Sequence, residues 1–209
     1  MILWEQANAY FDRNEFDKAL RCYMKVEKSP KVFFNMAIIQ IIKKNYTKAM
    51  KTLTKIVHLR WGIVHFLIAN CLVKMELFNE ALIWYQRCLD EFKGYKEIDY
   101  FTMGLDTKLS TFDVLMNMFI CYELANNEVK AREILLKAKR KYPGKLTGFP
   151  KRLSGIYTVF TAPNSEMVSP IAVTQAKLLP MPQTKEPIEE SKSTSIELPI
   201  ATSSPVFCK

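Results

Sequence analysis

Small and large hydrophobic residues recur at helical spacing through the first two thirds of the chain. The passages FDKALRCYMKV, YTKAMKTLTKI, FNEALIWYQRC and EVKAREILLKA each place a small residue, a large one four later and a compact one three after that. Offsets of four and three bring side chains to one face of a helix, so each passage predicts an amphipathic helix. The small residues are Ala19, Ala49, Ala81 and Ala131.

A second set of positions precedes these alanines by about twelve residues: Ala7, Ala37 and Ala69, with Phe119 in the fourth unit. Two antiparallel helices approach closely only where small side chains meet, and the pattern supplies small residues on both helices. This arrangement, with a period near 34, resembles tetratricopeptide repeats over residues 2–143. The expected fold is therefore all-α, a right-handed solenoid of four tetratricopeptide helix pairs.

The spacing of the four passages predicts an insertion. Their alanines lie 30, 32 and 50 residues apart, against a repeat of about 34. The extra residues fall between repeats three and four, after a helix ending near Phe92. The next helix is expected to begin at Ser110, because Asp113 stands where it completes a capping box. Residues 93–109 must therefore leave the solenoid and return to it.

The insertion has its own turn residues and apolar residues. Loops longer than about 12 residues are uncommon in compact helical arrays and are often functional. A tolerated surface insertion is the alternative. Gly94 and Gly104 are expected at turns. The residues expected to pin the insertion down are Ile98, Tyr100, Phe101, Met103 and Leu105, and the exposed candidates are Lys93, Tyr95, Lys96, Glu97 and Asp99.

Three stretches carry a more specific resemblance: LWEQANAYFDRNEFDKAL, FFNMAI and KGYKEIDYFTMGLDTKLSTFDVLMNM. Their order resembles the amino-terminal repeat domain of the large cytosolic activator subunit of the phagocyte NADPH oxidase (neutrophil cytosol factor two) and its relative, the NADPH oxidase activator. The resemblance covers roughly residues 2–182. Within the insertion the matching residues are Lys93, Gly94, Ile98, Asp99, Tyr100, Gly104 and Leu105.

The resemblance implies a non-enzymatic adaptor that binds a Rac-type small GTPase in its GTP form and activates a superoxide-generating NADPH oxidase. Its partners would be the GTPase and the membrane flavocytochrome of the oxidase. The protein would be cytoplasmic and recruited to the membrane on activation. The implied GTPase-binding positions are Lys93, Gly94, Tyr95, Glu97 and Asp99.

Three of these positions depart from the family. Lys93 stands in place of an Arg and cannot reproduce a planar, two-pronged contact. Tyr95 replaces an Asn and Glu97 replaces a hydrophobic residue, whereas Asp99 is kept. These departures bear on how tightly the chain would bind a GTPase and on which GTPase it would bind.

The chain divides by composition into a repeat domain, residues 1–162, and a tail, residues 163–209. The tail holds seven Pro, seven Ser and four Thr, a composition that is expected to stay flexible. Residues 151–160 predict a capping helix. Residues 170–182 resemble the family segment that runs along the groove of its own repeats. The groove-filling candidates are Ile171, Val173, Leu178 and Leu179.

The net charge of +9 is uneven. The tail contains four Lys and five Glu, so the first 162 residues carry +10. Such a charge favours acidic partners. A nucleic-acid role would use Lys137, Lys139, Arg140, Lys141 and Lys145. However, these residues also stand where cations offset the negative end of a helix, and no base-stacking motif accompanies them, so no nucleic-acid partner is expected.

A tetratricopeptide scaffold or chaperone adaptor without GTPase binding is the main alternative. Chaperone adaptors clamp a carboxyl-terminal peptide with Lys, Asn and Arg. In this register Asn8 and Asn35 are present, but Trp4, Ile63 and Leu67 occupy the basic positions. Apolar side chains cannot hold a carboxylate, which argues against a chaperone clamp.

Catalytic and metal chemistry have little support in the sequence. The five cysteines are widely spaced, and His58 and His65 have no neighbouring ligand or nucleophile pattern. We expect no cofactor, no metal and no enzymatic activity. The start lacks the features of a signal peptide, and no apolar run reaches the roughly 18 residues of a membrane-spanning helix. A cytoplasmic protein without stable membrane insertion is expected.

Overall fold

The computed structural model describes residues 2–145 and residue 155. The expected capping helix, the tail and the groove-filling candidates Ile171, Val173, Leu178 and Leu179 lie outside these residues. The helices are α1 Leu3–Asp12, α2 Phe16–Lys25, α3 Pro30–Ile42, α4 Tyr46–Leu53, α5 Gly62–Lys74, α6 Phe78–Glu91, α7 Thr111–Leu124 and α8 Glu128–Lys141. A 3₁₀ segment, η1 Thr54–Leu59, continues α4. Between α6 and α7 lie β1 Glu97–Asp99, η2 Phe101–Met103 and β2 Lys108–Ser110.

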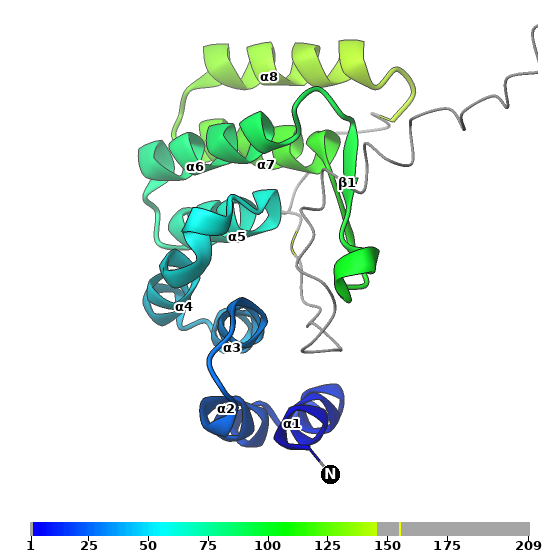
Figure 1. The fold of residues 1–209 in the computed structure, drawn as a ribbon. Coiled ribbons are helices and arrows are strands. Elements are labelled where there is room, and N and C mark those ends of the chain that lie inside the picture. The colour runs from blue at the N-terminus through cyan, green and yellow to red at the C-terminus, as the bar shows by residue number, and fades with distance from the viewer. Residues whose placement is uncertain (1, 146–154, 156–209) are drawn as a thin grey trace, which may run out of the picture. The chain divides into compact units, whose positions relative to one another are not determined.

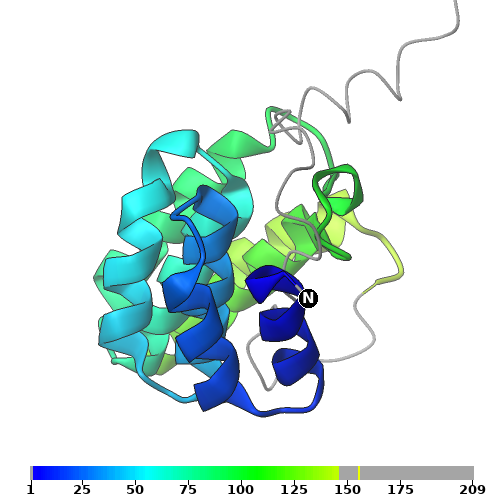
Figure 2. The same ribbon diagram turned by 60° about the horizontal axis from the view of Figure 1, so that its bottom comes forward.

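The helices pack as four consecutive pairs. The closest neighbours are α1 with α2, α3 with α4, α5 with α6 and α7 with α8, and each pair also contacts the next one (Figure 1). Figure 2 shows the same succession from a second direction. The prediction of an all-α tetratricopeptide solenoid is confirmed.

Small residues lie where the helices of a pair meet. Seven of the eight predicted positions are alanines with no exposed surface, and Phe119 of α7 is 6% exposed and packs in one cluster with Ala131 of α8. A larger side chain at such a crossing would push the helices apart. We expect this overpacking to lower the free energy of unfolding by about 1–3 kcal/mol. The buried alanines are Ala7, Ala19, Ala37, Ala49, Ala69, Ala81 and Ala131.

Helix α5 is buried nearly all round. It contacts α4, α6, α7 and η1, and its sequence GIVHFLIANCLVK has no polar face. A helix that is hydrophobic on all sides is stable only when it is enclosed. Helix α5 is therefore the element on which both the repeats and the insertion pack.

A buried tyrosine joins the first three helices. The hydroxyl of Tyr23 in α2 donates to Oδ1 of Asn8 in α1 and accepts from Nδ2 of Asn35 in α3 at 3.1 Å. Burial raises the pKa of Tyr23. Since unpaired buried polar groups are costly, the three side chains fix the second pair against the first.

A related cluster of one tyrosine and two asparagines lies at the third and fourth pairs. The hydroxyl of Tyr85 in α6 donates to Oδ1 of Asn70 in α5 at 2.5 Å, and Nδ2 of Asn117 in α7 donates to the same oxygen at 2.8 Å. These side-chain hydrogen bonds link the first repeat to the second and the third repeat to the fourth.

Candidate functional site

The insertion between α6 and α7 is a folded β-hairpin. Strands β1 and β2 pair antiparallel with Glu97 opposite Ser110, Ile98 opposite Leu109 and Asp99 opposite Lys108. The 3₁₀ segment η2 connects the two strands at the end of the hairpin (Figure 1). Residues 93–109 therefore have a defined structure within the solenoid.

Two turns shape the hairpin, as the glycines predict. At its entry Lys93 has φ of 47° and Gly94 has φ of 91°. At its tip Gly104 has φ of 83° and ends η2. Side chains are disfavoured at these angles, whereas glycine adopts them freely.

The hairpin has an apolar underside. Ile98, Tyr100, Met103 and Leu105 are at most 1% exposed and belong to the main core, so the prediction that they pin the insertion is confirmed. The prediction for Phe101 is wrong, because its side chain is 68% exposed. Phe101 is the first residue of η2, beyond the end of β1, and its side chain faces solvent there.

The hairpin is docked on α5 through Tyr100. The hydroxyl of Tyr100 accepts a hydrogen bond from the backbone N–H of Ile63 at 2.9 Å. Helix amides in the first turn have no partner within the helix, and this side chain supplies one. Gly62 lies against the same hydroxyl, and a Cβ there would lie 3.4 Å from the Tyr100 oxygen, in close van der Waals contact.

The base of the hairpin is also held from the side of α8. The hydroxyl of Tyr142, just after α8, donates to the backbone carbonyl of Lys96 at 3.1 Å and shares a short hydrogen bond with Thr111. The N–H of Thr111 donates to the same Lys96 carbonyl at 2.9 Å. Both the third and the fourth repeat therefore position the insertion.

A capping box fixes the exit of the hairpin, as predicted. The hydroxyl oxygen of Ser110 accepts from the N–H of Asp113 at 3.2 Å, and the Asp113 carboxylate accepts from the N–H of Ser110 at 3.3 Å. Two amides at the start of α7 are thereby satisfied.

An ion pair joins the loop before α5 to the end of α6, two residues before the insertion. Nε of Arg60 lies 2.8 Å from the carboxylate of Glu91, the last residue of α6. Glu91 is 6% exposed in all, while the Arg60 side chain is 71% exposed. Arg60 therefore places a positive charge on the surface beside the entry of the hairpin.

Charged side chains occupy the outer face of the hairpin. The amine of Lys108 lies 3.4 Å from the Glu97 carboxylate and 3.8 Å from the Asp99 carboxylate. Oδ1 of Asp99 also accepts from the N–H of Phe101 at 2.9 Å. Asp99 is half-buried and has a local structural role as well as an accessible edge.

The five predicted site residues fall into two groups. Lys93, Gly94 and Tyr95 form the entry turn, where the first two are exposed and Tyr95 is half-buried. Glu97 and Asp99 lie on the outer face of β1. The sequence reasoning missed Lys108, which stands opposite Asp99, and the outward-facing Phe101. The alternation of side chains along a strand was a signal for Lys108, whereas Phe101 lies in η2, outside the strands.

The groove positions of a chaperone clamp are occupied. Trp4, Ile63 and Leu67 are at most 1% exposed. The side-chain amides of Asn8 and Asn35 are both bonded to the Tyr23 hydroxyl. These residues are therefore used in packing and hydrogen bonding within the repeats.

The buried thiols and the buried histidine His65 are in structural surroundings, whereas His58 is exposed and Cys22 is half-buried. Burial raises the pKa of Cys71 to about 12 and that of Cys121 to about 11. Burial lowers the pKa of His65, which packs against Trp84. Among the described residues, no three His, Cys, Asp or Glu side chains are grouped as a metal site. In the same residues, no helix has both the length and the apolar character to cross a bilayer.

The paired helices with small residues at their crossings define a tetratricopeptide-repeat protein. YrrB, described as a TPR protein with an unusual peptide-binding site, superposes with a TM-score of 0.53 at 19% identity, covering 66% of each chain. A MamA fragment from Desulfovibrio magneticus RS-1 superposes with a TM-score of 0.54 at 11% identity, covering 68% of this chain and 76% of the fragment. These likenesses concern the fold alone.

Sequence similarity points to particular proteins. The chain is 28% identical over 146 residues to NADPH oxidase activator 1 of Rattus norvegicus, and 27% identical over 141 residues to neutrophil cytosol factor 2 of Homo sapiens. These matches cover 67% and 65% of this chain but only 32% and 26% of the relatives' lengths. No protein-family model matches the chain. The resemblance to the oxidase activators is confirmed over about two thirds of the chain.

Proposed function

We propose that this chain is a non-enzymatic adaptor that binds a Rac-type small GTPase in its GTP-bound form through the insertion. The carrying observation is the docked hairpin, an ordered element that presents Lys93, Glu97, Asp99 and Lys108 beside the exposed Arg60. A partner meets these charges without first ordering a loop, which lowers the entropic cost of binding.

The names of the similar proteins support a further part of the proposal, a role in NADPH oxidase activation. The similar proteins are named for NADPH oxidase activation and for the neutrophil cytosol. By that likeness the GTPase-bound adaptor is recruited from the cytoplasm to a membrane and activates a superoxide-generating NADPH oxidase through its flavocytochrome. The occupied clamp positions disfavour the chaperone-adaptor alternative. A tetratricopeptide scaffold without GTPase binding is the other alternative, and the binding experiment below separates it from the proposal.

Charge variants of the hairpin test the proposal. Lys93→Glu should weaken calorimetric binding to Rac loaded with a GTP analogue by about tenfold, which corresponds to about 1.4 kcal/mol. Lys48→Glu is the matched control, because Lys48 is an exposed lysine on α4, away from the insertion. Equal affinity of both variants would contradict the proposal.

Asp99 needs a substitution that preserves its local bond. Asp99→Asn removes the charge but keeps an oxygen that can accept from the N–H of Phe101. We expect weaker GTPase binding at an unchanged melting temperature. Superoxide production in a reconstituted oxidase should fall in the same order as the affinity of the variants; production that is independent of the variants would reject the oxidase role.

A further inference from the structure

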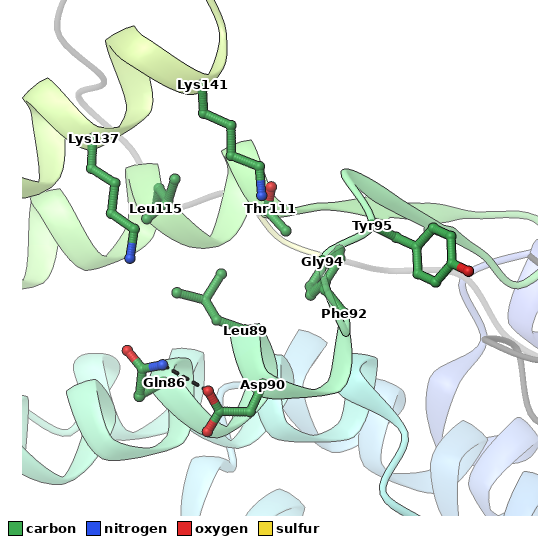
Figure 3. Close-up of a pocket in the computed structure, with 10 residues that line it drawn as sticks. All are labelled: Gln86, Leu89, Asp90, Phe92, Gly94, Tyr95, Thr111, Leu115, Lys137 and Lys141. Carbon is green, nitrogen blue, oxygen red and sulfur yellow. Dashed lines mark hydrogen bonds between the residues drawn. The ribbon is translucent and has the colours of Figure 1, made fainter. Parts of the chain in front are cut away.

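A cleft of about 220 Å³ lies where the end of α6, the entry of the insertion, α7 and α8 meet (Figure 3). We name it the lysine cleft. It does not include Glu97, Asp99 or Lys108 of the hairpin's outer face. Its lining residues are Gln86, Leu89, Asp90, Phe92, Gly94, Tyr95, Thr111, Leu115, Lys137 and Lys141.

One wall of the lysine cleft is cationic. Lys137 and Lys141 stand one helical turn apart on α8, and both side chains extend from the helix into the cleft (Figure 3). Burial lowers the pKa of Lys141, and the positive charges of Lys137 and Lys96 lower it further. Among residues 2–145, no carboxylate forms an ion pair with Lys137 or Lys141. A bound anion would relieve this repulsion.

The other surfaces of the cleft are not suited to a compact, highly charged anion. Leu89 is half-buried and offers apolar surface to the cleft, whereas Leu115 is 1% exposed and belongs to the core (Figure 3). Opposite the lysines, the Asp90 carboxylate accepts from Nε2 of Gln86 at 2.8 Å. A free phosphate would leave the apolar surface of Leu89 unused. A peptide with a carboxylate next to an aliphatic side chain would contact both the lysines and Leu89.

A second hollow continues the surface beyond the lysines. It is lined by Glu133, Leu136 and Arg140, together with the same Lys137 and Lys141. The side chain of Leu136 is 53% exposed and adds apolar surface to this hollow. The two lysines are thus flanked by apolar surface on both sides, and the two hollows give an extended chain room to cross them.

We propose that the lysine cleft binds an acidic peptide segment of a partner protein, with Glu or Asp carboxylates at Lys137 and Lys141 and aliphatic side chains on the flanking leucines. The lysines favour acidic residues in the peptide, and the leucines favour aliphatic residues next to them. The inference does not require GTPase binding, and the cleft shares only Gly94 and Tyr95 with the five candidate GTPase-binding residues.

Fluorescence anisotropy tests the proposal with a fluorescein-labelled peptide that contains Ile-Glu-Glu-Leu and a matched peptide that contains Ile-Gln-Gln-Leu. The acidic peptide should bind at least about tenfold more tightly, since its contacts to ammonium groups are charge-assisted. The affinity should fall as salt is added. Equal binding of the two peptides, or no binding of the acidic one, would overturn the proposal.

Variants locate the site. Lys137→Glu combined with Lys141→Glu should lose at least about tenfold in peptide affinity. The control combines Lys139→Glu with Lys48→Glu, which reverses two exposed charges outside the cleft. An equal loss of affinity in both double variants would show that the net charge of the protein alone determines binding, and would reject the cleft as the peptide site.

Further binding experiments distinguish an acidic peptide from other ligands of the cleft and from the GTPase. Displacement of the peptide by inorganic phosphate at matched ionic strength, or binding only to vesicles containing anionic phospholipid, would replace the peptide by a phosphate group and overturn the proposal. The cleft double variant should still bind the GTP-loaded GTPase. Loss of peptide binding with retained GTPase binding therefore separates this inference from the proposed function.

Discussion

The hydroxyl of Tyr100, in the insertion, accepts a hydrogen bond from the backbone N–H of Ile63, in the first turn of α5, at 2.9 Å. The two residues are far apart in sequence, and both are fully or almost fully buried. This contact makes the hairpin an extension of the third repeat rather than a loop attached to the surface.

Tyr100→Phe tests that relationship. The substitution leaves the Ile63 N–H without its partner in a buried site, so the free energy of unfolding should fall by about 1–3 kcal/mol. Chemical denaturation measures the change. Tyr95→Phe is the control, since Tyr95 is half-buried in the same insertion. A Tyr100→Phe protein as stable as the wild type would show that the bond contributes nothing.

Asn117→Ala tests the link between the third and fourth repeats. The Nδ2 group of Asn117 donates to Oδ1 of Asn70, which also serves Tyr85. Removing a fully buried side chain from this group should cost about 1–3 kcal/mol. Asn45→Ala is the comparison, because Asn45 is exposed and its side chain makes no capping bond at α4. Similar denaturation midpoints for both variants would rule out the structural role.

Alkaline pH should destabilise the protein through its buried tyrosines. Burial raises the pKa of Tyr23, Tyr85 and Tyr100 above the ordinary value of 10.0. The folded state keeps these protons at a pH where the unfolded state loses them. Their contribution is therefore complete below pH 10.0 and is lost as the pH rises above it, by about 1.4 kcal/mol per pH unit for each tyrosine.

Tyrosinate absorbance followed together with helical circular dichroism measures this effect. The three buried tyrosines should ionise only as the helices melt, above the ordinary pKa of 10.0. Ionisation of all tyrosines near pH 10 in a protein that stays helical would contradict the burial.

Thiol reactivity should separate the cysteines. Cys22 is half-buried, whereas Cys71, Cys88 and Cys121 are buried and burial raises the pKa of each. The thiolate is the reactive form, so alkylation of the native protein should modify Cys22 faster than the other three. Peptide mapping by mass spectrometry gives the rates. Equal rates in the native protein would show that the helix pairs open readily.

Much of the fold could be predicted from local patterns. The alanine positions required only the spacing of side chains around a helix, and Ala7 and Ala19 lie where that spacing places them. Ser110 and Asp113 form the expected capping box because such a box depends on four consecutive residues. Gly94 and Gly104 mark turns because few other residues adopt their backbone angles.

The site was predicted less completely because it depends on contacts between distant residues. No local pattern connects Tyr100 with Ile63, or Tyr142 with the Lys96 carbonyl. The pairing of β1 with β2 also required a register, which only the folded hairpin supplies. The error at Phe101 has a simpler cause: the residue was counted as apolar without regard to the face on which it lies.

The nucleotide dependence of GTPase binding tests the central claim most directly. Calorimetry should compare Rac loaded with a GTP analogue and Rac loaded with GDP, each titrated into this chain. The account predicts binding to the GTP-analogue form that is at least about tenfold tighter, a difference of about 1.4 kcal/mol. Equal affinity for the two forms, or binding to neither, would contradict it.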